Sequence, residues 1–217
     1  MGTHCSRSFT MAQERICLAL LFAFLVQIVL ANGRENRLNY SNVDLAKFLT
    51  DSPNVWVLKT TEPGNVTCRH DAYGKITDNK TTFTRFFVNN TSTNIKKLEG
   101  KLLVWESADK PAPGKFDAIE INDTVKKREY PLSEEVYEFQ SNDRSCAVVA
   151  VLDNSLETTS AWLDLRVSTS TIESHPGQQC EAEFQRVLSY YPERKERKQK
   201  WRMSYTSDCK NLLKKTS

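Results

Sequence analysis

Residues 146–180 decide the fold, and they read CAVVAVLDNSLETTSAWLDLRVSTSTIESHPGQQC. An apolar run at 147–152 ends in a polar turn, and a second run with alternating apolar residues follows at 161–168. A Pro-Gly break and a helix-like segment that begins at Glu181 come next. Two strands joined by a turn and followed by a helix predict the closing end of a small β-barrel. The cysteines at the two ends of the stretch suggest that disulfide bonds hold this part of the barrel.

The rest of the chain has the sequence pattern of an antiparallel sheet. Runs rich in β-branched and aromatic residues alternate with turn residues, and no helical crossover interrupts them. Such strands pair as a sandwich or an up-and-down barrel. A short helix at 42–49, which Pro53 ends, precedes the first strand. The eight predicted strands are at 54–61, 66–73, 81–88, 97–107, 116–122, 135–140, 145–152 and 159–168.

The segment after the last strand favours the barrel. Phe184, Val187 and Leu188 share one face of the segment 181–190, so this helix can pack against the outside of a barrel. We therefore predict an all-β fold: an eight-stranded antiparallel barrel with a short N-terminal helix and a C-terminal helix packed outside. Eight strands that close on themselves leave room for one small ligand. A sandwich stays the alternative, because strand patterns alone do not separate the two architectures.

Residues 1–31 have the pattern of a secretory signal peptide. Arg15 precedes an apolar run at 16–30, and Val29 and Ala31 stand at the small-residue positions before a cleavage site. An uncleaved anchor is the alternative, but a membrane span needs about 20 apolar residues. We expect residues 32–217 to form one secreted, extracellular domain with a basic C-terminal extension at about 193–217.

The cysteines and the sequons agree with secretion. Of six cysteines, Cys5 and Cys17 lie in the signal segment. The four that remain are an even set in a secreted chain, which indicates disulfide bonds and allows three pairings. Their wide spacing does not support a zinc ribbon. A glycosylated surface is predicted by six N-glycosylation sequons, at Asn39, Asn65, Asn79, Asn89, Asn90 and Asn122.

The composition argues against catalysis and against nucleic acid. The predicted mature chain has two histidines, His70 and His175, and none of the common nucleophile, metal or phosphate-binding motifs. The formal net charge of +3 is too balanced to imply nucleic acid. We predict a protein that is not an enzyme and needs no cofactor or metal. The basic segment 194–202 reads as a solvated extension, with a patch for heparan sulfate or another anionic surface as the alternative.

Aromatic residues within the predicted strands indicate a binding cavity. A lumen lined by rings and a few polar groups is a common small-molecule site. Carboxylates next to these rings would suit an organic cation, although alternation can turn the same carboxylates to water. Asp164 and Arg166 share the face of Trp162. From the strands, the candidate ligand-binding residues are Trp56, Trp105, Glu120, Tyr137, Phe139, Trp162, Asp164 and Arg166.

In order and spacing, these features resemble the tick salivary lipocalins of the histamine-binding type. The resemblance covers essentially the whole mature chain. It implies a lipocalin barrel with the disulfide pairs Cys68–Cys209 and Cys146–Cys180. The matching motifs are the early helix NVDLAKFL, Cys68 in the second strand, Cys146 at the start of the seventh, DLRV at 164–167, Pro176 with Cys180, and a late Cys209.

The resemblance also implies a role. Members of this family sequester host mediators during blood feeding: histamine or serotonin in some, fatty-acid-derived mediators or sterols in others. In the amine binders the early helix often reads D-A-W, an acid often follows the seventh-strand cysteine, and the eighth strand often reads acid-Leu-Trp-Val. Asp44 and Asp164 keep the acid here, which favours an amine and adds Asp44 to the candidate site. The chain departs from the pattern in the early helix, where Asp44 is followed by Leu45 and Ala46 with no Trp, and at Ala147 and Arg166; Arg166 would suit a carboxylate head group.

We therefore expect a secreted, glycosylated and monomeric lipocalin. We expect it to capture one small host mediator in its lumen and so to modulate inflammation or haemostasis. Some members of the family that the chain resembles bind host proteins such as complement components. The alternative function is thus an immunomodulator that binds a host protein and uses the barrel only as a scaffold. Neither hypothesis involves nucleic acid or a membrane.

Overall fold

The computed structural model describes residues 43–105, 113–126, 128–155, 159–174, 177–190 and 200–214, with the backbone alone at Gln178 and Tyr190. All of them belong to one unit of the chain, Asn39–Ser217. The predicted signal peptide and residues 194–199 of the basic segment lie outside the described residues.

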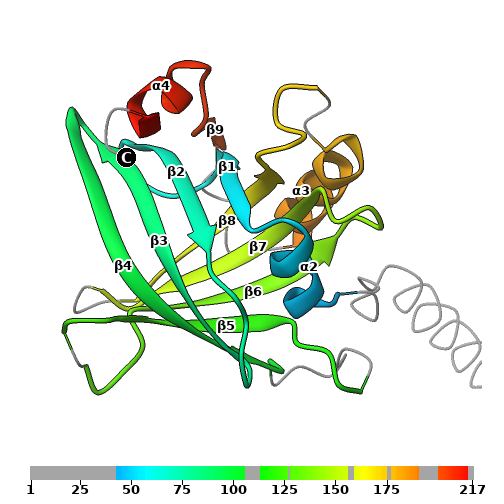
Figure 1. The fold of residues 1–217 in the computed structure, drawn as a ribbon. Helices are drawn as coiled ribbons and strands as arrows, with labels where there is room; N and C mark the ends of the chain where they lie inside the picture. Colours follow the sequence, from blue (N-terminus) through cyan, green and yellow to red (C-terminus); the bar gives the residue numbers. More distant parts are fainter. Residues whose placement is uncertain are drawn as a thin grey trace, which may run out of the picture. The chain divides into compact units, whose positions relative to one another are not determined.

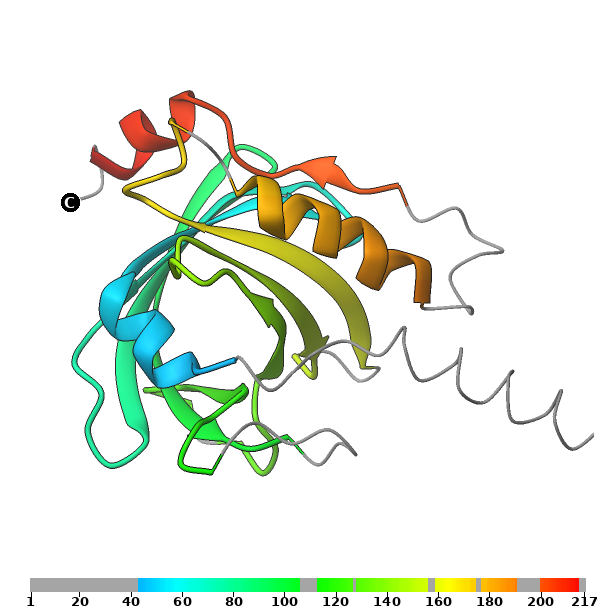
Figure 2. The ribbon, with the colours of Figure 1, turned by 90° about the vertical axis from the view of Figure 1, so that its right-hand side faces the viewer.

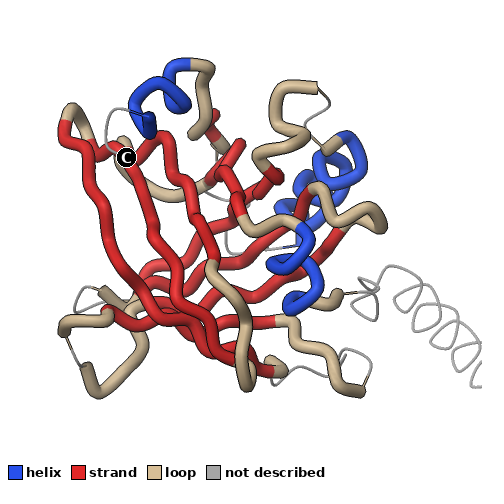
Figure 3. The backbone as a smooth tube through the Cα atoms, viewed as in Figure 1, coloured by secondary structure: helices blue, strands red, loops and turns tan. Residues whose placement is uncertain are grey.

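Within the described residues, nine antiparallel strands form one sheet that closes on itself (Figures 1 and 3). The strands are β1 (Asn54–Thr60), β2 (Val66–Tyr73), β3 (Lys80–Asn89), β4 (Ser92–Leu103), β5 (Ala118–Asp123), β6 (Ser133–Gln140), β7 (Cys146–Asp153), β8 (Ser160–Ser168) and the short β9 (Arg202–Met203). Strands β2 to β8 pair in sequence order, and β1 closes the barrel by pairing with both β2 and β8. The predicted eight-stranded barrel is confirmed, and its closure excludes the sandwich.

The largest boundary difference concerns β4, which begins at Ser92 instead of residue 97 and ends at Leu103 instead of residue 107. A two-residue turn joins β3 to β4, since Asn89 pairs with Ser92 and Asn90 has a φ of 54°. Asn tolerates this left-handed conformation better than most residues. The first half of β4 is largely exposed and polar, so it lacks the apolar alternation that reveals a strand.

Helix α2 (Leu45–Asp51) lies at one end of the barrel, which we call the closed end (Figure 2). Its N-terminus is capped by Asp44, whose carboxylate accepts the backbone N–H of Lys47 at 3.1 Å. Phe48 is fully buried and meets the ring of Tyr137 edge-on, with the centroids 5.7 Å apart. The helix thus belongs to the apolar cluster of the lumen. We call the opposite end, where the β1–β2, β3–β4 and β5–β6 loops lie, the mouth.

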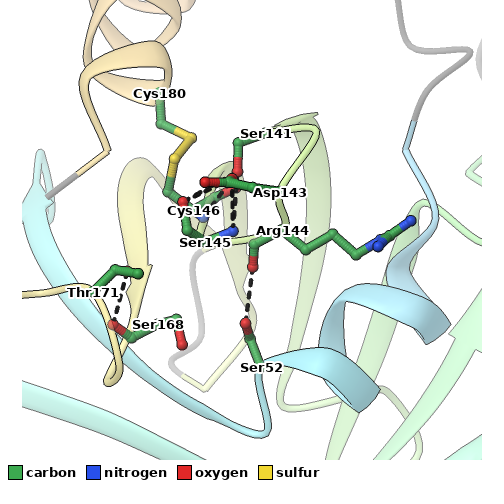
Figure 4. The surroundings of a disulfide bond; sticks show 9 residues. All are labelled: Ser52, Ser141, Asp143, Arg144, Ser145, Cys146, Ser168, Thr171 and Cys180. Atoms are coloured by element: carbon green, nitrogen blue, oxygen red, sulfur yellow. Dashed lines mark hydrogen bonds between the residues drawn. A yellow bond between two sulfur atoms is a disulfide. The ribbon is translucent and has the colours of Figure 1, made fainter. Parts of the chain in front are cut away.

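Helix α3 (Gln178–Tyr190) packs on the outside of β6, β7 and β8, as predicted (Figure 2). Phe184 is buried in this contact. A disulfide between Cys146 and Cys180 joins the first residue of β7 to the helix (Figure 4). Gly177 has a φ of 53°, and a Cβ atom there would lie 2.7 Å from the sulfur of Cys146. Both the backbone conformation and the space therefore require glycine.

The turn before β7 is fixed by side-chain hydrogen bonds (Figure 4). The hydroxyl of Ser141 accepts the backbone N–H groups of Ser145 and Cys146, both at 3.1 Å. Ser52, at the end of α2, donates its hydroxyl to the carbonyl of Arg144 at 2.8 Å. The disulfide, this turn and α2 therefore hold one another in place.

The C-terminal segment covers the outer face of β1 and β2. Strand β9 pairs with β1, and a disulfide between Cys68 and Cys209 ties β2 to helix α4 (Asp208–Lys214). Beneath it, Trp56 packs against His70 and Tyr205 at centroid distances of 4.4 and 5.1 Å. Both disulfides are the pairs that the resemblance implies. Part of the predicted basic extension is thus docked on the barrel. No described helix is long and apolar enough to cross a membrane.

Candidate ligand-binding site in the lumen

The strand register brings charged side chains from four strands into the lumen. Asp71 in β2 stands opposite Arg85 in β3, and across the barrel Glu135 in β6 stands opposite Val151 in β7. Residues that pair directly share a face of the sheet. Because Val151 belongs to the apolar cluster of the lumen, Glu135 faces inward too. Arg166 in β8 is only 1% exposed, so its guanidinium lies wholly inside the barrel.

These side chains form a continuous ion-pair network. Arg85 binds Asp71 with two hydrogen bonds of 2.7 Å, and it reaches Glu135 at 2.9 Å. Arg166 binds the other oxygen of Glu135 at 2.6 Å and an oxygen of Asp164 at 3.2 Å. The remaining oxygen of Asp164 accepts the hydroxyl of Thr60 at 2.7 Å. Two arginines are therefore shared among three buried carboxylates.

A third arginine, Arg69, extends the network toward the mouth. Arg69 in β2 binds Glu62 in the β1–β2 loop at 2.6 Å, and a second nitrogen of Arg69 lies 3.7 Å from Asp164. Its guanidinium also lies over the ring of Trp162, with 5.6 Å to the centroid. Arg69 thus connects the interior charges to the rim of the barrel.

The pairing changes the acidity of the buried groups. Burial raises the pKa of Glu135, but the charges of Arg166 and Arg85 outweigh it and lower that pKa to about 2. Burial lowers the pKa of Arg166, but Glu135 raises it well above its ordinary value. For Glu62 burial wins and raises the pKa, against the opposing effect of Arg69. Glu135 and Arg166 are therefore both ionised at neutral pH.

A cavity of about 160 Å³ opens above this network at the mouth. Its walls combine rings and aliphatic side chains with charged groups, among them Glu62, Arg69, Arg85, Phe87, Val151 and Trp162. We call it the mouth cavity. The network and the apolar cluster fill the lumen beneath it, so a ligand in this cavity contacts both rings and ion pairs. Among the described residues, no three His, Cys, Asp or Glu side chains gather as a metal site.

The sequence model of one family, described as tick histamine binding protein, matches residues 34–211. The chain belongs to this family. Insecticyanin from the tobacco hornworm Manduca sexta is 14% identical, with 79% of this chain and 85% of that chain covered and a TM-score of 0.52. This likeness shows the lipocalin fold.

Two further solved structures are less similar. Apocrustacyanin C1 is 15% identical over 77% of this chain and 84% of that chain, with a TM-score of 0.46. The siderocalin Ex-FABP is 8% identical over 72% of this chain and 91% of that chain, also with a TM-score of 0.46. The search of curated proteins found no matching sequence.

The structure places four of the predicted ligand-binding residues of this family member together in the lumen: Tyr137, Trp162, Asp164 and Arg166. Trp162 lines the mouth cavity, while Asp164 and Arg166 lie in the ion-pair network. Arg166 lies 6.0 Å from the ring centroid of Tyr137. Because Arg166 binds two carboxylates, it is not placed to pair with a ligand head group as the sequence suggested.

The other five predicted residues lie elsewhere. Asp44 caps helix α2, and Trp56 packs under the C-terminal segment on the outer face of β1. Trp105 follows the end of β4, where its backbone N–H donates to Asp117 at 2.7 Å. Glu120 lies 3.9 Å from Lys101 on the outer face of β5. Phe139 pairs with Val148 after an irregularity that turns it to the face opposite Tyr137.

Sequence reasoning missed most of the network, namely Glu62, Arg69, Asp71, Arg85 and Glu135. The alternation contained a signal. Arg69, Asp71 and Tyr73 occupy every second position of one predicted strand, which puts all three on one face. Of these three residues, Tyr73 belongs to the apolar cluster of the lumen, so the shared face points inward. A strand that places a ring and two charges on its inner face indicates a lumen with paired charges.

The sequons differ in their surroundings. Asn39 lies outside the described residues. Asn65, Asn89 and Asn90 are exposed near the mouth, while Asn122 is half-buried at the end of β5. Asn79 is also half-buried, and its side-chain amide donates to the carbonyl of Leu102 at 3.0 Å. Glycosylation at these positions stays a prediction.

Proposed function

We propose that this protein is a secreted lipocalin that sequesters one small host mediator in the mouth cavity by stoichiometric capture. Membership of a histamine-binding family supports binding of a small ligand. The observation that carries the proposal is the mouth cavity, whose walls combine Phe87 and Trp162 with charged side chains at the open end of a closed barrel. Rings with a few polar groups are the common design of a small-molecule site.

The cavity volume of about 160 Å³ sets the size of the mediator. A cavity of about 150 Å³ holds one benzene ring, and pockets for drug-sized ligands have about 300–1,000 Å³. A mediator with one or two rings, as small as histamine or serotonin, therefore suits this volume. A sterol or a fatty-acid-derived mediator would require Arg166 and its partners to move out of the lumen.

The test begins with native mass spectrometry of the secreted protein and continues with calorimetric titrations of histamine, serotonin, indole-3-acetate, a leukotriene and cholesterol. We expect a one-to-one complex with a one- or two-ring compound and none with cholesterol. If every compound fails and the secreted protein contains no ligand, the proposal is wrong, and the host-protein-binding alternative becomes the better hypothesis.

A cavity-filling variant locates the site. Val151 lines the mouth cavity and is 1% exposed, so Val151→Phe places a ring where the ligand would lie. We expect binding of the mediator to fall at least about 10-fold, at a cost of about 1–3 kcal/mol in stability from overpacking. The matched control is Val125→Phe, at a side chain that is 85% exposed. Equal affinities of the two folded variants would place the site elsewhere.

A further inference from the structure

The three carboxylates of the ion-pair network, Asp71, Glu135 and Asp164, are already occupied. Both oxygens of Asp71 accept from Arg85, and one also accepts the Tyr73 hydroxyl at 3.3 Å. The oxygens of Glu135 accept from Arg85 and Arg166, and those of Asp164 accept from Thr60 and Arg166. A cationic ligand that bound these three carboxylates would therefore have to displace a guanidinium that the chain itself supplies.

Two hydrogen-bond donors at the mouth cavity lack an acceptor. The Nε–H of Arg69 and the indole N–H of Trp162 are buried and have no hydrogen-bond acceptor among the described residues. Both side chains line the cavity and are only 8% and 5% exposed. A buried donor without a partner destabilises the folded state. A ligand that brings an acceptor to these two groups would offset part of that destabilisation.

Further positive charge lies on the same walls. Arg85 lines the cavity, and Lys96 stands directly opposite it in β4 with its ammonium 5.6 Å from the ring centroid of Phe87. Two acids also line the cavity. Glu62 is bound to Arg69 at 2.6 Å, and Asp153 accepts the backbone N–H of Ser155 at 2.8 Å. The group that a ligand meets beside Trp162 is thus a guanidinium.

We propose that the mouth cavity selects a small aromatic anion, whose carboxylate accepts hydrogen bonds from Arg69 and Trp162 and whose ring packs against Phe87 and Val151. The inference rests on the proposed function, since it uses the same cavity. Both N–H groups are buried, so binding would require the side chains of Arg69 and Trp162 to turn toward the ligand. Charge-assisted hydrogen bonds of this kind are about twice as strong as neutral ones.

Three probes with one indole ring separate charge from shape: indole-3-acetate, tryptamine and 3-methylindole. In calorimetric titrations of the secreted protein at neutral pH and low salt, we expect indole-3-acetate to bind at least about 10-fold more tightly than tryptamine, because 1.4 kcal/mol corresponds to tenfold. The neutral 3-methylindole should lie between the two. Tryptamine binding as tightly as indole-3-acetate, or more tightly, would overturn the selectivity for anions but leave the cavity as a binding site. Failure of all three probes would contradict the cavity itself.

Two conservative variants assign the donors. Arg69→Lys keeps a cation beside Glu62 but removes the Nε–H, and Trp162→Phe keeps a ring but removes the indole N–H. Each should lower the affinity ratio of indole-3-acetate to 3-methylindole about 3- to 10-fold, because a charged hydrogen bond is lost. Trp201→Phe, at a side chain that is 39% exposed, is the matched control and should leave the ratio unchanged. An unchanged ratio in both folded variants would refute the assigned donors.

Discussion

The two ends of the lumen are built by different means. At the closed end, side chains such as Phe48, Leu102 and Ile119 are fully buried against one another. Toward the mouth, the ion-pair network of Asp71, Arg85, Glu135, Asp164 and Arg166 occupies the same barrel interior. The closed end depends on shape and volume, whereas the network depends on each charge having its partner.

This difference explains where a ligand fits. Apolar side chains around α2 can close one end of a barrel without leaving a cavity, because they interdigitate. A network of arginines and carboxylates must keep its hydrogen-bond geometry, which limits how tightly its surroundings can pack. The mouth cavity lies above the network, next to Arg69 and Trp162. The polar half of the lumen therefore shapes the site, and the apolar half holds the barrel closed.

The largest effect should come from removing one charge of the network. Arg166→Met leaves Glu135 and Asp164 buried with one partner fewer, so we expect a loss of about 3–5 kcal/mol in the free energy of unfolding. Urea denaturation at neutral pH measures it. The matched control is Arg186→Met, in a partly exposed pair with Glu183 on α3, which should cost less than about 1 kcal/mol. Equal losses in the two variants would show that the buried network stabilises the fold no more than an exposed ion pair does.

The second largest effect should be a loss of folding stability as the pH falls. Glu135 has a pKa of about 2 in the folded protein and an ordinary value of 4.5, so the unfolded chain binds its proton first as the pH falls. The stability that this carboxylate contributes is complete above pH 4.5 and is lost between about pH 4.5 and 2. Its size is about 3 kcal/mol at 1.36 kcal/mol for each pKa unit.

The control for the acid effect is Glu135→Gln. This variant should be less stable at neutral pH, and its stability should fall less steeply between about pH 4.5 and 2, because the group that takes up the proton is gone. Denaturation curves at several pH values would show this. Parallel curves for the two proteins would mean that Glu135 does not titrate as the network requires.

The smallest effect should come from the closed end. Phe48→Leu keeps an apolar side chain of similar volume and should cost about 1–1.5 kcal/mol, because the surrounding apolar residues can repack. This cost should be the same at high and low salt, since no charge is involved. The loss from Arg166→Met, in contrast, includes the cost of buried unpaired charges. A strong salt dependence for Phe48→Leu would show that the two halves are not independent.

The sequence predicted the barrel well because alternation and turn residues are local signals. Every predicted strand exists, and only β4 is displaced, at a place where its first residues are polar and exposed. The outer helix was recognised from Phe184 and its neighbours, which repeat with the period of a helix. These features depend on residues close together in the chain, so a pattern of one strand or one helix is sufficient.

The site was predicted only in part, because its partners are far apart in the sequence. Arg166 and Glu135 are separated by 31 residues and meet only through the register of β6, β7 and β8. Without that register, Asp164 looked like an acid available for an amine, and Arg166 like a cation available for a carboxylate. In the folded barrel the two bind each other, Glu135 also binds Arg166, and Thr60 also binds Asp164. Trp56, in contrast, was placed in the lumen although the C-terminal segment buries it on the outer face.

The protein's own arginines neutralise the interior carboxylates, which therefore need no cationic ligand. The most direct test is an NMR titration of the Glu135 side-chain carboxylate in the ligand-free protein. We expect the carboxylate to stay ionised as the pH falls toward about 2. Protonation of Glu135 at pH 4.5 or above would show that Arg85 and Arg166 do not hold its charge, and would contradict the account.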